Sequence, residues 1–142
     1  MKSNMDNSIK IGKYMRMIVE HHQPLMTLVP INKITALMAH ENTAYPFIIY
    51  SRTQISPQYN KDLDGSFGHV DTVQITVDCH GGSYSESADV ANEFRNALEG
   101  KGYNGSDIYI ERFQLVSASE GTDGQGDFVQ TLVFQTQTKS KS

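Results

Sequence analysis

The segment from Val70 to Gly100 constrains the fold most, because it has the pattern of one strand followed by one helix. Apolar and polar residues alternate up to Cys79, a period typical of a half-buried strand. A pair of glycines then interrupts the alternation. Ser83 and Glu86 follow at the spacing of a capping box, in which side chains satisfy free backbone N–H groups at a helix start. The sequence therefore predicts a strand that ends near Cys79 and a helix that begins near Ser83.

The predicted helix has one side that can be buried. At 100° per residue, its small and apolar side chains fall on one stripe, and its charged and amide side chains fall opposite. The stripe consists of Ser87, Val90, Ala91, Phe94, Ala97 and Leu98. Gly100 and Gly102 supply residues that can end a helix in a left-handed conformation. The alanines on the stripe predict that this helix lies close to a sheet.

The length and composition of the chain fit a single domain over residues 1–142, with flexible tails expected at 1–8 and 137–142. No apolar run approaches the roughly 18 residues of a membrane span. The single cysteine cannot form an intrachain disulfide, which fits a reducing compartment. The net charge of −4 comes without a basic tract, which argues against a protein that binds nucleic-acid phosphates.

The rest of the chain predicts further elements around this unit. A helix is expected over residues 9–22, followed by a short helical turn after Pro24. Strands are expected over 31–39, 47–50, 69–79, 107–117 and 128–134, with a bulge near Glu111 or Arg112. We predict an α+β fold with two layers, in which an antiparallel or mixed sheet of four to five strands carries two main helices on one face.

The run Phe47 to Tyr50 is apolar on both faces, which is typical of a central strand. If the helices cover one face, the other face, expected to carry Ile48 and Tyr50, needs a neighbouring subunit or remains an exposed apolar patch. A long loop is expected over Pro57–Gly68, and loops of this length are often functional. The candidate interaction surface, for a neighbouring subunit or another partner, consists of Ile48, Tyr50, Arg52, Gln54, Tyr59, Lys61, Asp62, Asp64 and Phe67.

The sequence predicts no catalytic, cofactor or metal residues. Glycine motifs that bind phosphates are absent. The adjacent pairs His21-His22 and Cys79-His80 do not have zinc-ligand spacing, and Cys79 continues an inward-facing alternation, so a buried thiol is favoured. Asp62 and Asp64 resemble the start of a calcium loop whose later ligand positions lack the required oxygens.

The order of these elements resembles the small tail-completion or tail-terminator proteins of long-tailed bacteriophages and prophages. The matching features run from about Ile11 to Phe134 and include the amphipathic first helix, the segment 25–29, the strand start at 44–50 and the block 71–100. The resemblance implies helices on an antiparallel sheet and a homo-oligomeric ring, with six-fold symmetry expected. It implies no enzymatic activity.

The resemblance also implies partners and a place of action. The ring would cap the tail tube, contact the tail tube protein, and dock the head-completion or connector protein. It would assemble in the host cytoplasm and reside in the tail or neck of the virion, with DNA only passing through its lumen.

Two other functions stay open on the sequence. One is another neck or tail-tube component, and the other is a small-ligand-binding or enzyme domain with a cleft between the second helix and the loop before His69. A nucleic-acid-binding module is disfavoured by the charge and by the lack of an aromatic and basic stacking face.

Overall fold

The computed structural model describes residues 6–61 and 67–140 of the chain. Its helices are α1 (Ile11–Glu20), α2 (Gln23–Leu28) and α3 (Tyr84–Leu98), with 3-10 turns at Ser8–Lys10 and Ile31–Lys33. Its strands are β1 (Ile34–Ala36), β2 (Phe47–Lys61), β3 (Phe67–Gly81), β4 (Tyr103–Asn104), β5 (Ile108–Ile110), β6 (Gln114–Thr122) and β7 (Phe128–Ser140). Among the described residues, no helix is long and apolar enough to cross a membrane.

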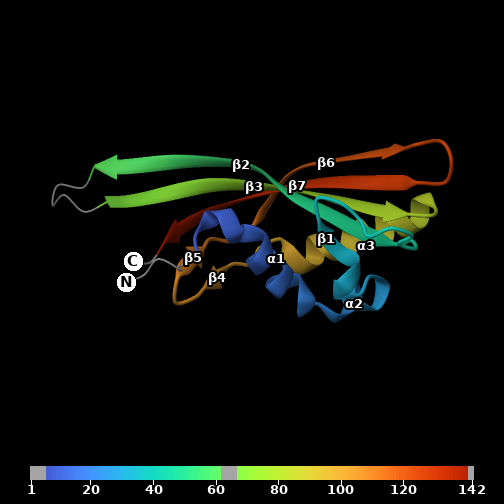
Figure 1. Cartoon of the computed structure of the whole chain (residues 1–142), viewed down its shortest axis with the longest axis horizontal. Helices are drawn as coiled ribbons and strands as arrows, with labels where there is room; N and C mark the ends of the chain where they lie inside the picture. The colour runs from blue at the N-terminus through green and yellow to red at the C-terminus, as the bar shows by residue number, and fades with distance from the viewer. Residues whose placement is uncertain (1–5, 62–66, 141–142) are drawn as a thin grey trace.

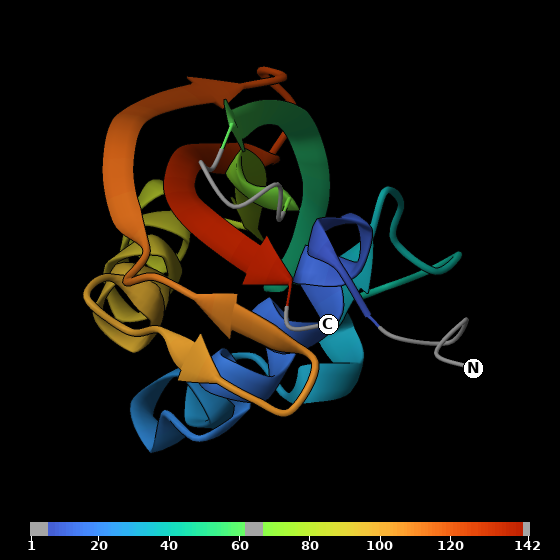
Figure 2. The same ribbon diagram turned by 90° about the vertical axis from the view of Figure 1, so that its left-hand side faces the viewer.

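The strands form one mixed seven-stranded sheet that curls into a half-barrel (Figures 1 and 2). Strands β1, β2, β3 and β7 lie side by side in that order. The far edge of β7 is shared, because its first part pairs with β6 and its last residues pair with β5, which in turn pairs with β4. β1 is parallel to β2, and every other pair is antiparallel. The helices lie on one side of this sheet (Figure 1).

The predicted strand–helix unit is confirmed as β3 and α3. Every residue of the predicted stripe is buried, from Ser87 to Leu98. The Ser83 side chain accepts a hydrogen bond from the Glu86 N–H at 3.1 Å, and the Glu86 carboxylate accepts one from Gly82 N–H at 2.8 Å. Gly100 has a φ of +81°, the left-handed conformation expected at a helix end. Local sequence signals therefore suffice to define this unit.

The first helix is also confirmed, although it begins with a 3-10 turn that Asn7 caps by accepting from Ile9 N–H. Ile11, Met15 and Val19 of α1 are buried against α3 and the sheet. Of the flexible tail expected at residues 1–8, residues 6–8 lead into and begin this 3-10 turn, and residues 1–5 lie outside the described residues. Asp6 and Ser8 are buried because Asp6 binds the side chains of Lys10, Lys13 and Tyr14, and Ser8 donates to Asp71.

The α+β class is confirmed, but the prediction of four to five strands is wrong, because the sheet has seven strands among the described residues. The two main helices are α1 and α3, and α2 is the short helical segment expected after Pro24. β4 and β5 are two and three residues long, too short to show a period in the sequence. β6 lies at an edge, and most of its side chains are exposed, so it does not need alternating apolar residues.

The single strand expected over 107–117 is two strands, because the chain leaves β7 after Ile110 and returns at Gln114. This break lets Ile110 and Phe113 both be buried, which a continuous strand would place on opposite faces.

The boundaries of the expected loop also needed correction. The loop expected over Pro57–Gly68 is wrong at both ends, since β2 continues to Lys61 and β3 begins at Phe67. Of the flexible tail expected at 137–142, residues 137–140 belong to β7, and residues 141–142 lie outside the described part. Thr136 and Thr138 are buried where β7 pairs with β3. Because both residues are polar, the sequence did not indicate that the strand continues here with its side chains facing the core.

Candidate interaction surface

β2 carries the first four residues of the predicted interface, of which Ile48 is buried, Tyr50 is partly buried, and Arg52 and Gln54 are exposed. Ile48 pairs with Cys79 and is fully buried in the core, so the expectation that Ile48 lies on an uncovered face is wrong. The alternation has the opposite phase, because Ile48 and Tyr50 face the helices, whereas Phe47 and Ile49 face away. Ile48 therefore stabilises the fold within one chain and has no surface left for a partner.

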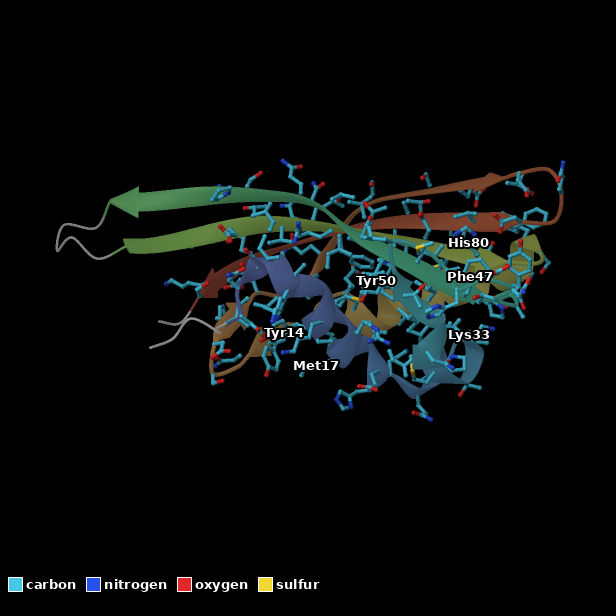
Figure 3. The ribbon with its side chains drawn as sticks, in the orientation of Figure 1. Tyr14, Met17, Lys33, Phe47, Tyr50 and His80 are labelled. Atoms are coloured by element: carbon cyan, nitrogen blue, oxygen red, sulfur yellow. The ribbon has the colours of Figure 1, made fainter. Side chains whose placement is uncertain are left out.

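Tyr50 and Arg52 connect β2 to the start of α1. A Cβ built on Gly12 would lie 2.8 Å from Cε2 of Tyr50, so the glycine lets the helix approach the ring closely. Figure 3 shows Tyr50 between the strand and the helices. Arg52 Nη1 donates to the Ile9 carbonyl at 2.9 Å, and its side chain stays exposed. The exposed Gln54 donates to Ser56 Oγ at 2.9 Å.

The remaining predicted residues belong to the far end of the β2–β3 hairpin. Tyr59 and Lys61 are the partners of His69 and Phe67 in the antiparallel ladder. Asp62 and Asp64 lie outside the described residues. β3 pairs with β7 only from Val70 onward, so among the described residues the last part of the hairpin is a two-stranded ribbon. In Figure 1 this ribbon extends beyond the helices.

The face of the sheet that the helices leave uncovered is polar and carries little charge. On β3 and β7 its central residues are Thr72, Gln74, Thr76, Asp78, Thr131, Val133, Gln135 and Gln137. Cross-strand contacts hold it together, because Thr131 Oγ1 donates to Asp78 at 2.7 Å and Gln74 donates to Gln135 at 3.4 Å. The described residues of this face therefore form a polar surface with cross-strand hydrogen bonds and without a cluster of positive charge.

Sequence reasoning missed an aromatic cluster on this face at the end opposite the ribbon. Tyr45 stacks on Phe47 with ring centroids 5.5 Å apart, and Phe47 stacks on His80 at 4.6 Å (Figure 3). His80 Nδ1 lies 3.0 Å from an Asp127 oxygen. Burial, together with a side-chain hydrogen bond between Tyr45 and Asp127, raises the pKa of Tyr45. The cluster depends on the antiparallel register that pairs Phe47 with His80, and no signal in the sequence specifies that register.

The described residues bear on the sequence predictions about a reactive thiol and a metal site. Cys79 is fully buried as predicted, and burial raises the pKa of its thiol, which keeps it protonated. No group of three potential metal ligands occurs among residues 6–61 and 67–140. A surface hollow of about 610 Å³ lies beside β1, lined by Arg16, Ala36, His40 and Tyr50, and not at the cleft beside α3 that the ligand-binding alternative used.

Comparison with solved structures supports the fold. The chain resembles one chain of the structure described as "Virion of native gene transfer agent (GTA) particle", with a TM-score of 0.62 and 13% sequence identity. The alignment covers 88% of this chain and 91% of that chain. At this identity the likeness establishes the shared fold alone.

The sequence comparisons give the family. No curated protein matches the sequence. The family model described as "Tail completion protein gp17" matches residues 21–138, which include α2, α3 and almost the whole sheet. The chain therefore belongs to the tail completion protein gp17 family, a family of structural proteins of the phage tail.

Proposed function

We propose that the protein is a tail terminator: a homo-oligomeric ring, of six subunits, that caps the tail tube and joins the tail to the head. The observation that carries the proposal is the β2–β3 ribbon, which extends past the helix-covered body (Figure 1). Family membership supports a role in the tail, and the ribbon supplies a contact element that the core does not need.

The predicted interface fits this proposal in a revised form. Arg52 and Gln54 are exposed on β2, and the ladder continues from them through Tyr59 and Lys61 to Phe67. Tyr50 contributes by orienting α1 against the strand. The partners in the proposal are other copies of this chain, the tail tube protein and the head-completion or connector protein, with assembly in the host cytoplasm.

Tail assembly in a host that carries the phage genome without a functional copy of this gene tests the proposal. A tail terminator stops polymerisation, so its loss gives overlong tails that do not join heads, as measured by electron microscopy. Complementation with the intact gene restores tail length. A complete lack of tails would instead identify a tube component and would contradict the proposal.

The purified protein provides a second test. We expect ring-shaped particles in electron micrographs at high concentration or after addition of tube protein. A particle that stays monomeric under both conditions, and whose melting temperature rises on addition of a metal or metabolite, would favour the ligand-binding alternative.

A further inference from the structure

The described part of the sheet has two open edges, at opposite ends of the strand order β2-β3-β7-β6. β1 pairs only with Ile48, Ile49 and Tyr50 of β2, so among the described residues no strand lies outside β2 beyond Tyr50. At the other side, β6 pairs with β7, and no described strand covers its outer edge. The Leu115 N–H is bound by the Glu99 carboxylate at 3.3 Å, so the open part of β6 begins after it. Open edges present unpaired N–H and C=O groups that can pair with another strand.

The two open edges belong to different strands, and the directions of these strands allow them to pair between copies. From one edge to the other the strands run β2, β3, β7 and β6, and each neighbouring pair is antiparallel. β2 and β6 therefore point in opposite directions. If copies repeat around an axis that runs along the strands, β6 of one copy meets β2 of the next copy antiparallel, which is the more stable type of ladder. A contact between two different edges is heterologous, and such contacts generate rings when the rotation closes.

The charges of the two edges are also complementary. The described part of β2 up to Gln58 contains one charged residue, Arg52, whose side chain is exposed. β6 contains one charged residue, Glu120, which is exposed and acidic. Hydrogen bonds from Gln130 and Tyr84 lower the pKa of Glu120 and keep it ionised. Copies that meet β2 to β6 bring opposite charges together, whereas contacts between two β2 edges or two β6 edges bring like charges together.

Exposed apolar side chains lie beside the same edges. Leu37 is 78% exposed and Ile9 is 60% exposed, and both line one hollow with Tyr50 and Arg52 of β2. On β6, Val116 is 47% exposed at the point where the ladder with β7 shifts register. A second copy that adds to these edges covers apolar surface on both sides of the contact.

We propose that the outer edge of β6 in one copy pairs, antiparallel, with the outer edge of β2 beyond Tyr50 in the next copy, so that the sheets of neighbouring subunits become continuous. The proposal rests on the ring proposed above and gives that ring its subunit interface. The pairing run on β2 ends at Pro57, because proline has no N–H to donate.

Cysteine cross-linking tests this interface directly. Gln54 and Ser56 lie on the same face of β2, beyond its register shift, and Ser117 and Ser119 lie on the equivalent face of β6. We would make the single variants Gln54→Cys, Ser56→Cys, Ser117→Cys and Ser119→Cys, mix one β2 variant with one β6 variant, and oxidise. The native Cys79 is fully buried and does not interfere. Directly opposite residues in a ladder lie within disulfide range.

The expected result is a disulfide-linked dimer in mixtures and none in either variant alone. In one antiparallel register, position 54 lies opposite position 119 and position 56 lies opposite position 117. If the Gln54→Cys and Ser119→Cys variants cross-link, the Ser56→Cys and Ser117→Cys variants should therefore cross-link as well. A protein that carries both cysteines of a productive pair should give a ladder of linked species that ends at the ring size. Asp89→Cys, on the exposed side of α3, is the matched control and should not cross-link with any β2 variant.

The outcomes separate this interface from the ring itself. Rings in micrographs of the unmodified protein without a cross-link in any mixture would overturn the interface and leave the proposed function standing. If the Gln54→Cys variant cross-links with Ser117→Cys and the Ser56→Cys variant cross-links with Ser119→Cys, the antiparallel direction would be overturned, since this pair of results requires parallel strands. Absence of rings under all conditions would overturn the proposed function.

Discussion

The two halves of the β2–β3 hairpin have the same secondary structure and very different surroundings. In the inner half, Ile48, Val77 and Cys79 are fully buried beneath the helices, with β1 and β7 on either side. In the outer half, among the described residues, β2 and β3 pair only with each other, because β3 does not pair with β7 before it reaches Val70. The inner half therefore stabilises the domain, and we propose that the outer half contacts a partner.

The largest effect is expected from the core beneath the inner half. Phe134 on β7 pairs with Ile75, is fully buried, and lies 5.9 Å from the Phe94 ring of α3. Phe134→Ala should lower the free energy of unfolding by about 3–5 kcal/mol, because it removes apolar contacts and leaves a cavity. Gln135→Ala, on the uncovered face next to it, should change it by no more than about 0.5 kcal/mol. Urea unfolding measures both, and equal losses would contradict the assignment of the two faces.

A moderate effect is expected at the start of α3, which covers the inner half. Ser83→Ala removes the side chain that accepts from the Glu86 N–H and should cost about 1 kcal/mol. Ser85 is exposed in the first turn of the same helix, so Ser85→Ala is the matched control and should leave the free energy of unfolding nearly unchanged. The comparison of their thermal midpoints sharpens the helix assignment, and a control as destabilising as the cap variant would refute it.

A smaller, pH-dependent effect is expected at Asp6, beside the start of α1. Hydrogen bonds from Lys13, Tyr14 and Lys10 hold the pKa of Asp6 well below its ordinary value of 3.8. Because the folded-state pKa is depressed, the stabilisation is present above pH 3.8 and is lost as the pH falls below it toward the folded-state pKa. Asp6→Asn should lower the thermal midpoint at pH 7 and reduce the dependence of the midpoint on pH below 4. Identical acid profiles for both proteins would disprove this linkage.

The smallest effect on stability, together with a loss of tail-length control, is expected in the outer half. Gln58 and Val70 are direct partners, so residues 59–69 can be replaced by Asn-Gly, the pair that favours a two-residue hairpin turn. The thermal midpoint should stay nearly unchanged, because the replaced strands extend beyond the helices (Figure 1) and pair only with each other. Tail-length control in the complementation assay should be lost. A large fall in midpoint would assign the ribbon to the core instead.

The sequence could predict the parts of the fold that local chemistry defines. The alternation of β3, the cap at Ser83 and the stripe of α3 each have a period or a spacing, and all three were confirmed. β4, β5 and β6 could not be predicted as separate strands, because short or exposed edge strands carry no period. The burial of Thr136 and Thr138 could not be predicted either, because polar side chains do not continue the apolar alternation that indicates an inward-facing position.

The candidate interface was harder to predict than the fold. The phase of Ile48 depends on which neighbour covers which face of β2, and four consecutive apolar residues do not specify a phase. The stacking of Phe47 on His80 depends on the register of the β2–β3 ladder, which a sequence without a short turn does not fix. The family resemblance, by contrast, depended on the order of the elements and was confirmed.

β7 is bound along its length by three partners, with β3 on one side and β6 and β5 in succession on the other. A slip of β7 by one residue would have to break all of these ladders at once and would turn Leu132 and Phe134 out of the core. Its alignment is thus over-determined, and its amide hydrogens should exchange only when the whole domain opens. If the assembled protein transmits mechanical load between tail and head, β7 would be the part of its backbone that resists deformation most.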